Sequence, residues 1–301
     1  MASLFDIGKS GLNSYRQALT VTGQNIANLN TEGYKRREAS LEEVAVAKGG
    51  ITNKAEGSGS GVRVSSIRRS FDEFLLNKAR SASAGAEASI SYYESIKRLE
   101  NVLLPGDNNL GNSIGRFYDS LQEIVAAPAD LGPRTIALEQ GRVLAGEFQQ
   151  VAKVVDELHD GVTTQISQQL QMVNGFAAQL ASLNQQLSGT GANSQNNSLL
   201  DKRDAIIDSI SEYVGVSVEL SDSGVASLTI GSSGRGPVLL EGNRSQNLSF
   251  VANASEVTFF CSSASKAIAT NQVDDGSLSG LSRAYSNISD TMNDVDHLAF
   301  S

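Results

Sequence analysis

The feature that most constrains the fold is an apolar stripe that runs without a proline from Leu144 to Leu187. Along it, apolar residues recur every three or four positions, which is the spacing of one face of a helix. Pro133, of a type favoured in the first turn of a helix, precedes the stripe, and Gly189 follows it. At the usual helical rise the predicted helix is roughly 80 Å long. This length indicates a rod-like domain rather than a compact domain around a pocket.

Beyond residue 70, four more segments have a helical apolar period. Pro105 ends the first of them, and the second stops before Pro128. The last reaches Ser301 without a closing Gly or Pro, so we expect the chain to be a fragment of a longer protein. These helices are predicted over residues 71–104, about 114–127, 199–214 and 277–301.

The character of the sequence changes between the last two of these helices. Short segments rich in β-branched and aromatic residues alternate there with turn residues. Five strands are predicted, over residues 216–220, 225–230, 238–240, 248–251 and 257–261. Their regular spacing indicates a small β domain inserted after the helices.

The chain begins with a predicted helix over residues 4–29. Its apolar and small residues recur at an average step near 3.5, which favours a partner helix rather than a sheet. This stripe consists of Leu4, Ile7, Gly11, Tyr15, Leu19, Thr22, Ile26 and Leu29. The Asn-rich and Gly-containing segment 28–33 is expected to end the helix, because these residues accept left-handed conformations.

Residues 34–70 have no helical period. Short strands are predicted at 44–46, 50–52 and 62–67, and the Gly/Ser segment 57–61 is interpreted as a hinge or hairpin loop.

These patterns predict a mainly α chain with a smaller β domain. Its rod is expected to be a long antiparallel helical bundle that resembles a coiled coil. The predicted parts are an N-terminal assembly helix and motif (1–35), an extended or β linker region (36–70), a helical-bundle rod (71–214), a β-rich domain (215–275) and the start of a returning rod helix (276–301).

Composition excludes several classes of function. The 301 residues carry a formal net charge of -9, which argues against binding to nucleic acid or to an anionic membrane. No run approaches the ~20 apolar residues of a membrane-spanning helix, and no signal peptide is recognisable, so any export would use another route. The single cysteine, Cys261, lies in an apolar run and is expected to be a buried, inert thiol.

Asp201, Asp204 and Asp208 share one face of a predicted helix, with Arg203 nearby. Carboxylates placed together could form a metal or an acid–base site. A solvated charge pattern is the commoner meaning of such spacing. We therefore expect a solvated face, with no catalytic, cofactor-binding or metal-binding residues.

The other candidates for chemistry have simple interpretations. His159 and His297 lack a second imidazole or a cysteine at ligand spacing, so exposed or interhelical positions are expected. The segment 57–61 lacks the Lys-Ser/Thr ending of a phosphate loop. The basic residues at 35–37 and 68–69 are expected to form local salt bridges or subunit contacts.

Both ends of the chain carry apolar helical stripes, although termini are usually the least ordered parts of a domain. Pairing with each other or with neighbouring copies would order them. A rod with such ends indicates a self-assembling structural subunit, and no nucleophile–base pair supports an enzyme.

The segment from Asn25 to Lys35, Asn-Ile-Ala-Asn-Leu-Asn-Thr-Glu-Gly-Tyr-Lys, closely resembles the N-terminal signature shared by bacterial flagellar rod, hook and hook-associated proteins. Residues 59–74 and 197–211 are similar to segments of the hook-associated protein 1 family, which forms the hook–filament junction. The resemblance covers essentially the whole chain. It also implies that Asp201 and Asp204 belong to a structural helix.

The resemblance implies an extracellular flagellar subunit, exported through the flagellar type III apparatus with a chaperone. It implies a ring of copies between the hook protein on one side and a second junction protein and the flagellin filament on the other. Terminal helices would line the axial core, through an axial motif and the first helix's stripe. The expected residues are Asn25, Asn28, Asn30, Thr31, Gly33 and Tyr34 in the motif, and Leu4, Ile7, Tyr15, Leu19, Ile26 and Leu29 in the stripe.

The resemblance also implies that the mate of the first helix lies beyond Ser301, so that residues 1 to about 35 would be mobile or abnormally packed. No cofactor, small-molecule substrate, nucleic acid or membrane insertion is expected. Two alternatives stay open: another flagellar axial protein of the hook or rod type, and a type III-secreted coiled-coil adhesin or effector.

Overall fold

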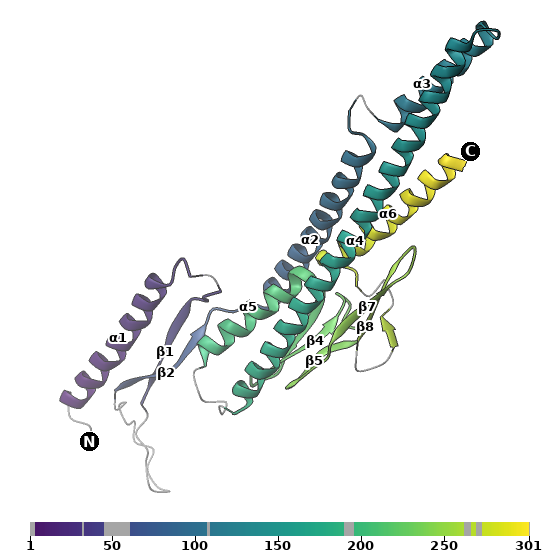
Figure 1. Ribbon diagram of the computed structural model, residues 1–301. Coiled ribbons are helices and arrows are strands. Elements are labelled where there is room, and N and C mark those ends of the chain that lie inside the picture. The colour runs from purple at the N-terminus through teal and green to yellow at the C-terminus, as the bar shows by residue number, and fades with distance from the viewer. Residues whose placement is uncertain are drawn as a thin grey trace.

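The computed structural model describes residues 4–31, 33–44, 61–106, 109–189, 196–261, 266–268 and 273–300. The predicted strands at 44–46 and 50–52 and the Gly/Ser link at 57–61 lie wholly or mostly outside these residues. The described chain forms a long helical rod with a β region beside its lower half. A helix with a β-hairpin projects from the same end (Figure 1).

Four helices build the rod: α2 (Glu73–Leu103), α3 (Leu110–Ala126), α4 (Leu131–Gly189) and α6 (Ser277–Phe300). Their ends follow local chemistry. The Asp72 carboxylate accepts a hydrogen bond from the backbone N–H of Leu75 at 3.0 Å and caps the start of α2. Asn109 caps α3 in the same way, and α3 ends before Pro128.

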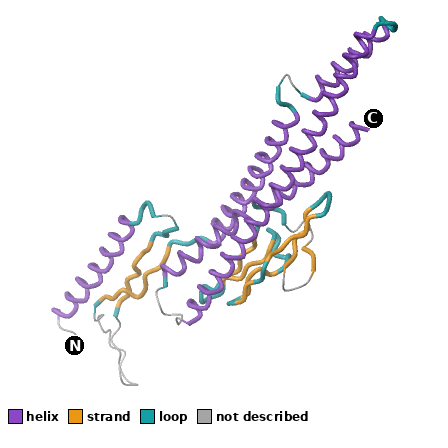
Figure 2. Tube along the Cα trace, in the orientation of Figure 1, coloured by secondary structure: helices purple, strands orange, loops and turns teal. Residues whose placement is uncertain are grey.

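Helix α4 is the longest element, with 59 residues and a length of about 90 Å. α3 packs antiparallel against its first half, while α6 lies along its central part and joins it to α2 (Figure 2). Pro133 stands in its first turn, as predicted. From Val155 onward the predicted stripe is the buried face of α4, with Val155, Val162, Ile166, Leu170, Val173, Leu180, Leu183 and Leu187 buried.

The β region contains two antiparallel sheets that follow helix α5 (Asn197–Tyr213). The first sheet has the order β3 (Val216–Leu220), β4 (Ala226–Ile230), β5 (Val238–Glu241) and β6 (Arg244–Ser245). The second has the order β7 (Leu248–Ala252), β8 (Val257–Cys261) and β9 (Lys266–Ile268). All five predicted strands are present. β6 and β9 are too short, at two and three residues, to give a pattern.

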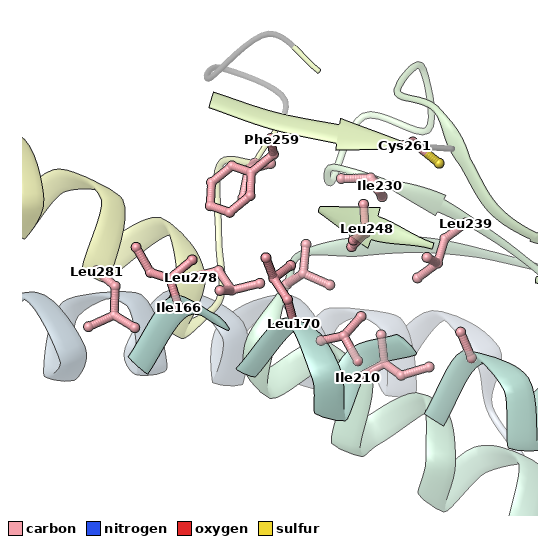
Figure 3. Close-up of a cluster of buried hydrophobic side chains, with 14 of the residues drawn as sticks. Ile166, Leu170, Ile210, Ile230, Leu239, Leu248, Phe259, Cys261, Leu278 and Leu281 are labelled. Carbon is pink, nitrogen blue, oxygen red and sulfur yellow. The ribbon is translucent and has the colours of Figure 1, made fainter. Parts of the chain in front are cut away.

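One hydrophobic core joins the rod to both sheets (Figure 3). Ile166 and Leu170 of α4 pack with Leu281 of α6, with Ile230 of the first sheet and with Phe259 of the second. The core therefore continues across the boundary expected between residues 214 and 215. The division of the chain into separate domains stays a prediction.

Two asparagines of α4 pair with the backbone of the strands. Asn174 donates to the Leu248 carbonyl at 2.9 Å and accepts from the Leu248 N–H at 2.8 Å. Asn184 donates to the Ala226 carbonyl at 2.8 Å and accepts from its N–H at 3.1 Å. Each side-chain amide takes the place of a neighbouring strand. The sheets are thus fixed on the helix at two points that an apolar pattern does not reveal.

An N-terminal unit, defined here as α1 (Leu4–Ala27), β1 (Arg37–Glu43) and β2 (Val62–Arg69) with the turn after α1, lies beside α5. β1 and β2 pair antiparallel, with a register shift between Ser40 and Leu41. The sequence does not predict β1, because Arg-Glu-Ala-Ser-Leu-Glu-Glu contains few β-favouring residues. The partner helix expected for the stripe of α1 stays a prediction, because the stripe lies mostly away from this hairpin and another face of α1 packs on it. α1 therefore has a defined packing partner.

The predicted fold class, a mainly α rod with a smaller β region, is confirmed. Among the helices of the described ranges, none is long and apolar enough to cross a membrane.

Candidate functional site

Helix α1 has two different long faces. The face on the hairpin is formed by small and polar residues, whereas the opposite face is apolar and exposed. Ser14 and Val21 are buried on the hairpin side, and Ser10, Ala18 and Asn25 are half-buried beside them. The side chains on this face allow the helix to lie close to the strands.

Two serines fix the first half of α1 to the start of β2. The Ser10 hydroxyl accepts a hydrogen bond from the backbone N–H of Val62 at 3.1 Å, and the Ser14 hydroxyl donates to the Val62 carbonyl at 3.0 Å. Gly61 has a φ of 116°, and a Cβ atom there would lie 2.1 Å from the Ser10 Oγ atom. Only glycine fits this approach without rearrangement.

Asn25 fixes the second half of α1 to β1. Its Oδ1 atom accepts hydrogen bonds from the Tyr34 hydroxyl at 2.8 Å and from the Arg37 N–H at 2.9 Å. Its Nδ2 atom donates to the Arg37 carbonyl at 2.8 Å. The structure therefore brings together two residues of the predicted motif, Asn25 and Tyr34. Asn25 also bonds to Arg37, a residue that the sequence places only in a basic cluster.

The other motif residues shape the turn after α1. The Thr31 hydroxyl donates to Asn28 Oδ1 at 3.1 Å, and the Thr31 N–H donates to the Asn28 carbonyl at 3.0 Å. Gly33 has a φ of 76°, and a Cβ atom there would lie 3.5 Å from the Cβ atom of Ala205 in α5. Asn30 is exposed. The turn thus lies close to α5 at Gly33, where the left-handed backbone favours glycine.

The opposite face of α1 carries an exposed heptad seam, defined as Phe5, Leu12, Tyr15, Leu19, Ile26 and Leu29. Phe5, Leu12, Leu19 and Ile26 are spaced by seven residues and are 77%, 76%, 71% and 71% exposed. Tyr15 and Leu29 occupy the alternate positions of the same seam, which is the arrangement of a coiled-coil stripe. Of the predicted stripe, Leu4 is also exposed and Ile7 lies at the edge of the hairpin face. The prediction omitted Phe5 and Leu12.

An open groove of about 580 Å³ borders this seam, between α1 and the segment that enters β1. Its apolar wall includes Val21, Ile26 and Leu29, and Tyr34 and Arg37 form part of the opposite wall. The seam and the groove together provide an apolar surface of the kind that a partner helix covers.

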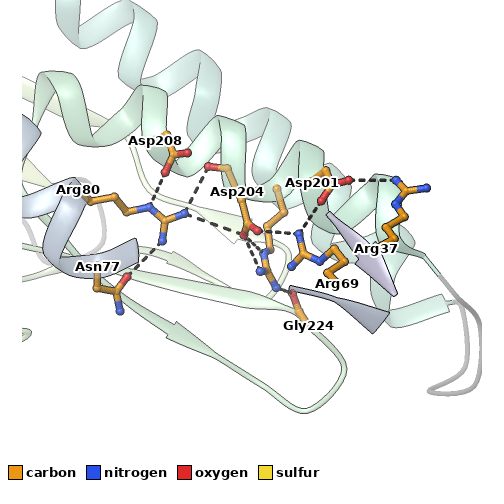
Figure 4. Close-up of polar contacts among 9 residues, drawn as sticks. Arg37, Arg69, Asn77, Arg80, Asp201, Asp204, Asp208 and Gly224 are labelled. Atoms are coloured by element: carbon orange, nitrogen blue, oxygen red, sulfur yellow. Dashed lines mark hydrogen bonds and ion pairs between the residues drawn. The ribbon is translucent and has the colours of Figure 1, made fainter. Parts of the chain in front are cut away.

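Behind the hairpin, seven charged residues form an arginine–aspartate network, defined as Arg37, Arg69, Arg80, Arg203, Asp201, Asp204 and Asp208 (Figure 4). Arg37 Nη2 lies 3.1 Å from Asp201 Oδ2. Arg69 Nη1 lies 2.8 Å from both Asp201 Oδ1 and Asp204 Oδ2. Two arginines of the hairpin therefore share two carboxylates of α5. These two arginines of the basic segments 35–37 and 68–69 form salt bridges, but with partners far away in the sequence rather than local ones.

The network continues into the rod and the β region. Arg80 of α2 donates from Nε to Asp208 Oδ1 at 2.6 Å. Arg203 donates from Nη2 to Asp204 Oδ1 at 2.6 Å and from Nη1 to the Gly224 carbonyl at 2.7 Å. Gly224 lies in the turn between β3 and β4. The N-terminal unit, α2, α5 and the first sheet thus meet at one charged cluster.

The prediction of a solvated face is wrong for Asp201 and Asp204, whereas the Asp208 side chain stays 41% exposed. The side chains of Asp204 and Arg203 are 1% and 2% exposed. Burial lowers the pKa of the Arg203 guanidinium from its ordinary value, and the charge of Asp204 opposes this shift. Asp201 and Asp204 can be buried because arginines from elements far apart in the sequence neutralise them.

The charged groups of the network pair with one another. Each of its carboxylates is paired with at least one guanidinium. The described part of the chain contains no group of three or more His, Cys, Asp and Glu side chains arranged to hold a metal ion. The network can hold the N-terminal unit, α2, α5 and the first sheet together and fix their relative positions.

The remaining candidates have structural positions. His159 of α4 packs against Tyr285 of α6 with ring centroids 4.1 Å apart and ring planes tilted by 36°, so its expected interhelical position is confirmed. His297 is exposed. Cys261 is buried against the core, as expected.

Replacement of Asn25 by alanine is expected to release the second half of α1 from β1, because three hydrogen bonds are lost at once. Each is worth about 0.5–1.5 kcal/mol. Hydrogen exchange at the Arg37 amide should become about tenfold faster or more. The matched control is Asn13→Ala, on an exposed position of the same helix. Equal exchange rates in the two variants would contradict the assigned role of Asn25.

Comparison with known proteins places these elements in a family. The model described as "Flagellar hook-associated protein FlgK helical domain" matches residues 96–301, which is more than half of the chain. The chain belongs to this family. A second model, described as "Flagella basal body rod protein", matches residues 5–35, and this segment contains α1 and the motif.

Curated members of the FlgK family are similar over most of this chain. "Flagellar hook-associated protein 1" of Salmonella typhimurium (strain LT2) is 30% identical over 262 residues, covering 86% of this chain and 46% of the relative. Its namesake in Escherichia coli (strain K12) is 29% identical over 85% of this chain and 46% of the relative. That of Bacillus subtilis (strain 168) is 29% identical over 78% of this chain and 47% of the relative. The chain spans about half the length of these relatives.

A solved structure shows the same fold. The flagellar hook junction protein FlgK from Burkholderia pseudomallei aligns with a TM-score of 0.59 and 24% identity, over 70% of this chain and 38% of that chain. Arg37, Arg69 and Arg80 lie between the two segments that the family models match, whereas the three aspartates lie within the FlgK helical domain. The network therefore connects the part of the chain between the two matched segments to the FlgK segment.

Proposed function

We propose that this chain is part of a structural subunit of the bacterial flagellum that joins the hook to the flagellin filament and is required for filament assembly. Membership of the FlgK family supports this role. The observation that carries it is the heptad seam of α1, which is exposed and is set away from the rod on a hairpin. The apolar surface of such a seam is removed from water when another helix covers it.

We infer that the seam and its groove pair with a helix of similar pattern inside an axial core. The proposed partners are other copies in a ring, the hook protein, and a second junction protein with the flagellin side of the junction. The subunit would be extracellular, exported by the flagellar type III apparatus with a chaperone. The rod and the β region would lie farther from the axis, because their apolar side chains are mainly buried in a core of their own rather than in contact with an axial partner.

Deletion of the complete gene tests the proposal. Hooks should form normally, while flagellin should appear in the medium because it finds no junction on which to polymerise. Electron microscopy of hooks and measurement of secreted flagellin give the two readouts, and the complete gene returned on a plasmid is the control. Normal filaments in the deletion strain would refute the proposal.

The seam itself predicts an assembly defect without a folding defect. Leu12→Asp combined with Leu19→Asp, placed in the complete gene, should reduce filaments per cell about tenfold or more, because two leucines no longer bury apolar surface. Both side chains are exposed in this chain, so its unfolding free energy should change by less than about 1 kcal/mol. Gln17→Asp with Gln24→Asp, exposed on the other side of α1, is the control with equal added charge. Filament counts that fall equally in both pairs would show a charge effect rather than a seam.

A hook or rod protein is the nearest alternative, since the rod-protein model matches α1 and the motif. That match ends at residue 35, however, and the FlgK helical domain covers residues 96–301. Immunogold labelling separates the remaining possibilities. A band at the hook–filament boundary fits the junction, label along the hook or rod fits an axial protein, and diffuse label fits a secreted adhesin or effector.

A further inference from the structure

The two oxygens of the Asp204 carboxylate serve different parts of the molecule. Oδ2 accepts from Arg69 of β2 at 2.8 Å, whereas Oδ1 accepts from Arg203 Nη2 at 2.6 Å and from Arg203 Nε at 2.9 Å. Arg203 in turn donates to the Gly224 carbonyl at 2.7 Å. A continuous chain of charge-assisted hydrogen bonds therefore runs from the hairpin to the turn between β3 and β4 (Figure 4).

Burial makes this series of hydrogen bonds rigid. The side chains of Arg69, Asp204 and Arg203 are 5%, 1% and 2% exposed. If Arg69 moves away, water has little access to take its place at Asp204 Oδ2. The carboxylate then has to turn toward the remaining guanidinium groups, and Arg203 has to follow it or lose a bond.

The turn at the far end responds to Arg203 because it is seated closely on α5. Gly224 has a φ of 81°, and a Cβ atom there would lie 2.6 Å from Leu200 Cδ2 and 3.4 Å from Arg203 Nη1. The Gly224 N–H donates to the Ser221 carbonyl at 2.8 Å, and the Val225 N–H donates to the Ser221 hydroxyl at 3.1 Å. A shift of Arg203 therefore acts on the backbone of residues 221–225.

We propose that Asp204 is a coupling hub, that is, a residue through which two parts of the molecule affect each other. Through it, the position of the N-terminal unit on α5 sets the position of the β3–β4 turn, and the position of the turn in the same way affects the N-terminal unit. The two coupled parts are the N-terminal unit, which carries the exposed heptad seam, and the β3–β4 turn of the first sheet. Residue 222 at the tip of this turn is exposed, so the turn is available to a neighbour. Engagement of α1 would thus be transmitted to an outer surface.

That use in assembly rests on the proposed function, whereas the coupling itself is tested on this chain alone. A failed coupling test leaves the flagellar role untouched, and a failed gene deletion leaves the coupling untouched.

The test is hydrogen exchange followed by mass spectrometry in Arg69→Gln. Exchange at residues 221–225, to which Arg69 makes no hydrogen bond or ion pair, should become about fivefold to tenfold faster, in the usual range of coupling between sites. Arg63→Gln is the matched control, because Arg63 is also on β2 but pairs only with exposed Glu42, at 3.1 Å. Arg69→Lys keeps the charge and is the second variant if Arg69→Gln does not fold. An effect confined to β1 and β2 would overturn the proposal.

A second route from Arg69 to Arg203 has to be separated from the hub. The ring of Phe71 lies 5.2 Å from the Arg69 guanidinium and 5.9 Å from that of Arg203. If Asp204 is the hub, Arg69→Gln should have no further effect at 221–225 in an Asp204→Asn background. If the effect persists in that background, the coupling runs through Phe71 and the proposal is wrong.

Coupling between two sites is reciprocal. Gly224→Ala strains the turn, because its backbone conformation is left-handed and its space is filled by Leu200. This change should make exchange at the β1 and β2 amides faster by a similar factor. Gly242→Ala, at a left-handed glycine of another turn with no atom near its Cβ position, is the control. Unchanged exchange in the hairpin of Gly224→Ala would contradict the hub.

Discussion

Replacement of Asp204 by alanine is expected to lower the free energy of unfolding by about 3–5 kcal/mol. The carboxylate lies within hydrogen-bonding distance of Arg69 and Arg203 and 4.0 Å from Arg80. Without it, three nearly buried guanidinium groups lose a shared counter-ion in a place where they cannot be hydrated well. Equilibrium unfolding in urea, followed by circular dichroism, gives the measurement.

Two further variants identify the cause. Asp204→Asn keeps the shape of the side chain and some of its hydrogen bonds, so a smaller loss is expected from the missing charge alone. Asp222→Ala removes an exposed carboxylate from the nearby β3–β4 turn and should change the stability by less than about 0.5 kcal/mol. A loss for Asp204→Ala as small as that of Asp222→Ala would mean that the arginines find other partners.

The rod could be predicted because its signals are local. Apolar residues of α4 from Val155 to Leu187 are buried at the spacing that the sequence shows. The ends of two helices follow from Pro105 and Pro128, each of which acts on its own neighbours. Strands with four or five residues and clear turns, such as β4 and β8, could be predicted for the same reason.

The positions of α1 on its hairpin and of the sheets on α4 could not be predicted, because polar side chains fix them at particular points. Ser10 and Ser14 lie against β2, and Asn174 and Asn184 lie against strands of the β region. A hydrophobic pattern assigns such residues to solvent, whereas here their hydrogen bonds to the backbone compensate for burial. Nothing local in the sequence identifies the partner strands.

The candidate site was recognised only in part. The resemblance identified Asn25 and Tyr34, but not that they bond to each other. The predicted stripe stepped from Leu4 by threes and fours and so passed over Phe5 and Leu12, which a strict seven-residue repeat includes.

The arginine–aspartate network was missed for a different reason. Arg37 and Asp201 are 164 positions apart in the sequence, and Arg69 and Asp204 are 135 apart. Three aspartates on one helix face are solvated unless the fold brings cations to them. Their burial is therefore a property of the tertiary structure, and the helix alone does not contain it.

Gly280→Ala is expected to destabilise the rod by about 3 kcal/mol or more, although it adds one methyl group. A Cβ atom at this position in α6 would lie 2.1 Å from the carbonyl oxygen of Ala88 and 3.0 Å from the backbone nitrogen of Tyr92, both in α2. Backbone atoms inside a helix cannot turn aside as a flexible side chain can. The two helices must therefore move apart, and the packing of Leu281 and Tyr285 in the core is loosened with them.

A second glycine makes this prediction specific. Gly161 stands inside α4 with no atom within 4 Å of its Cβ position, so Gly161→Ala adds the same methyl group without a clash. Alanine is favoured over glycine within a helix by about 0.8–1.0 kcal/mol, and this variant should therefore be more stable than the parent chain. In thermal or urea unfolding, we expect the free energy of unfolding to fall in Gly280→Ala and to rise in Gly161→Ala. If Gly280→Ala were also stabilising, helix propensity would dominate, and the close approach of α2 and α6 at Ala88 would not hold in solution.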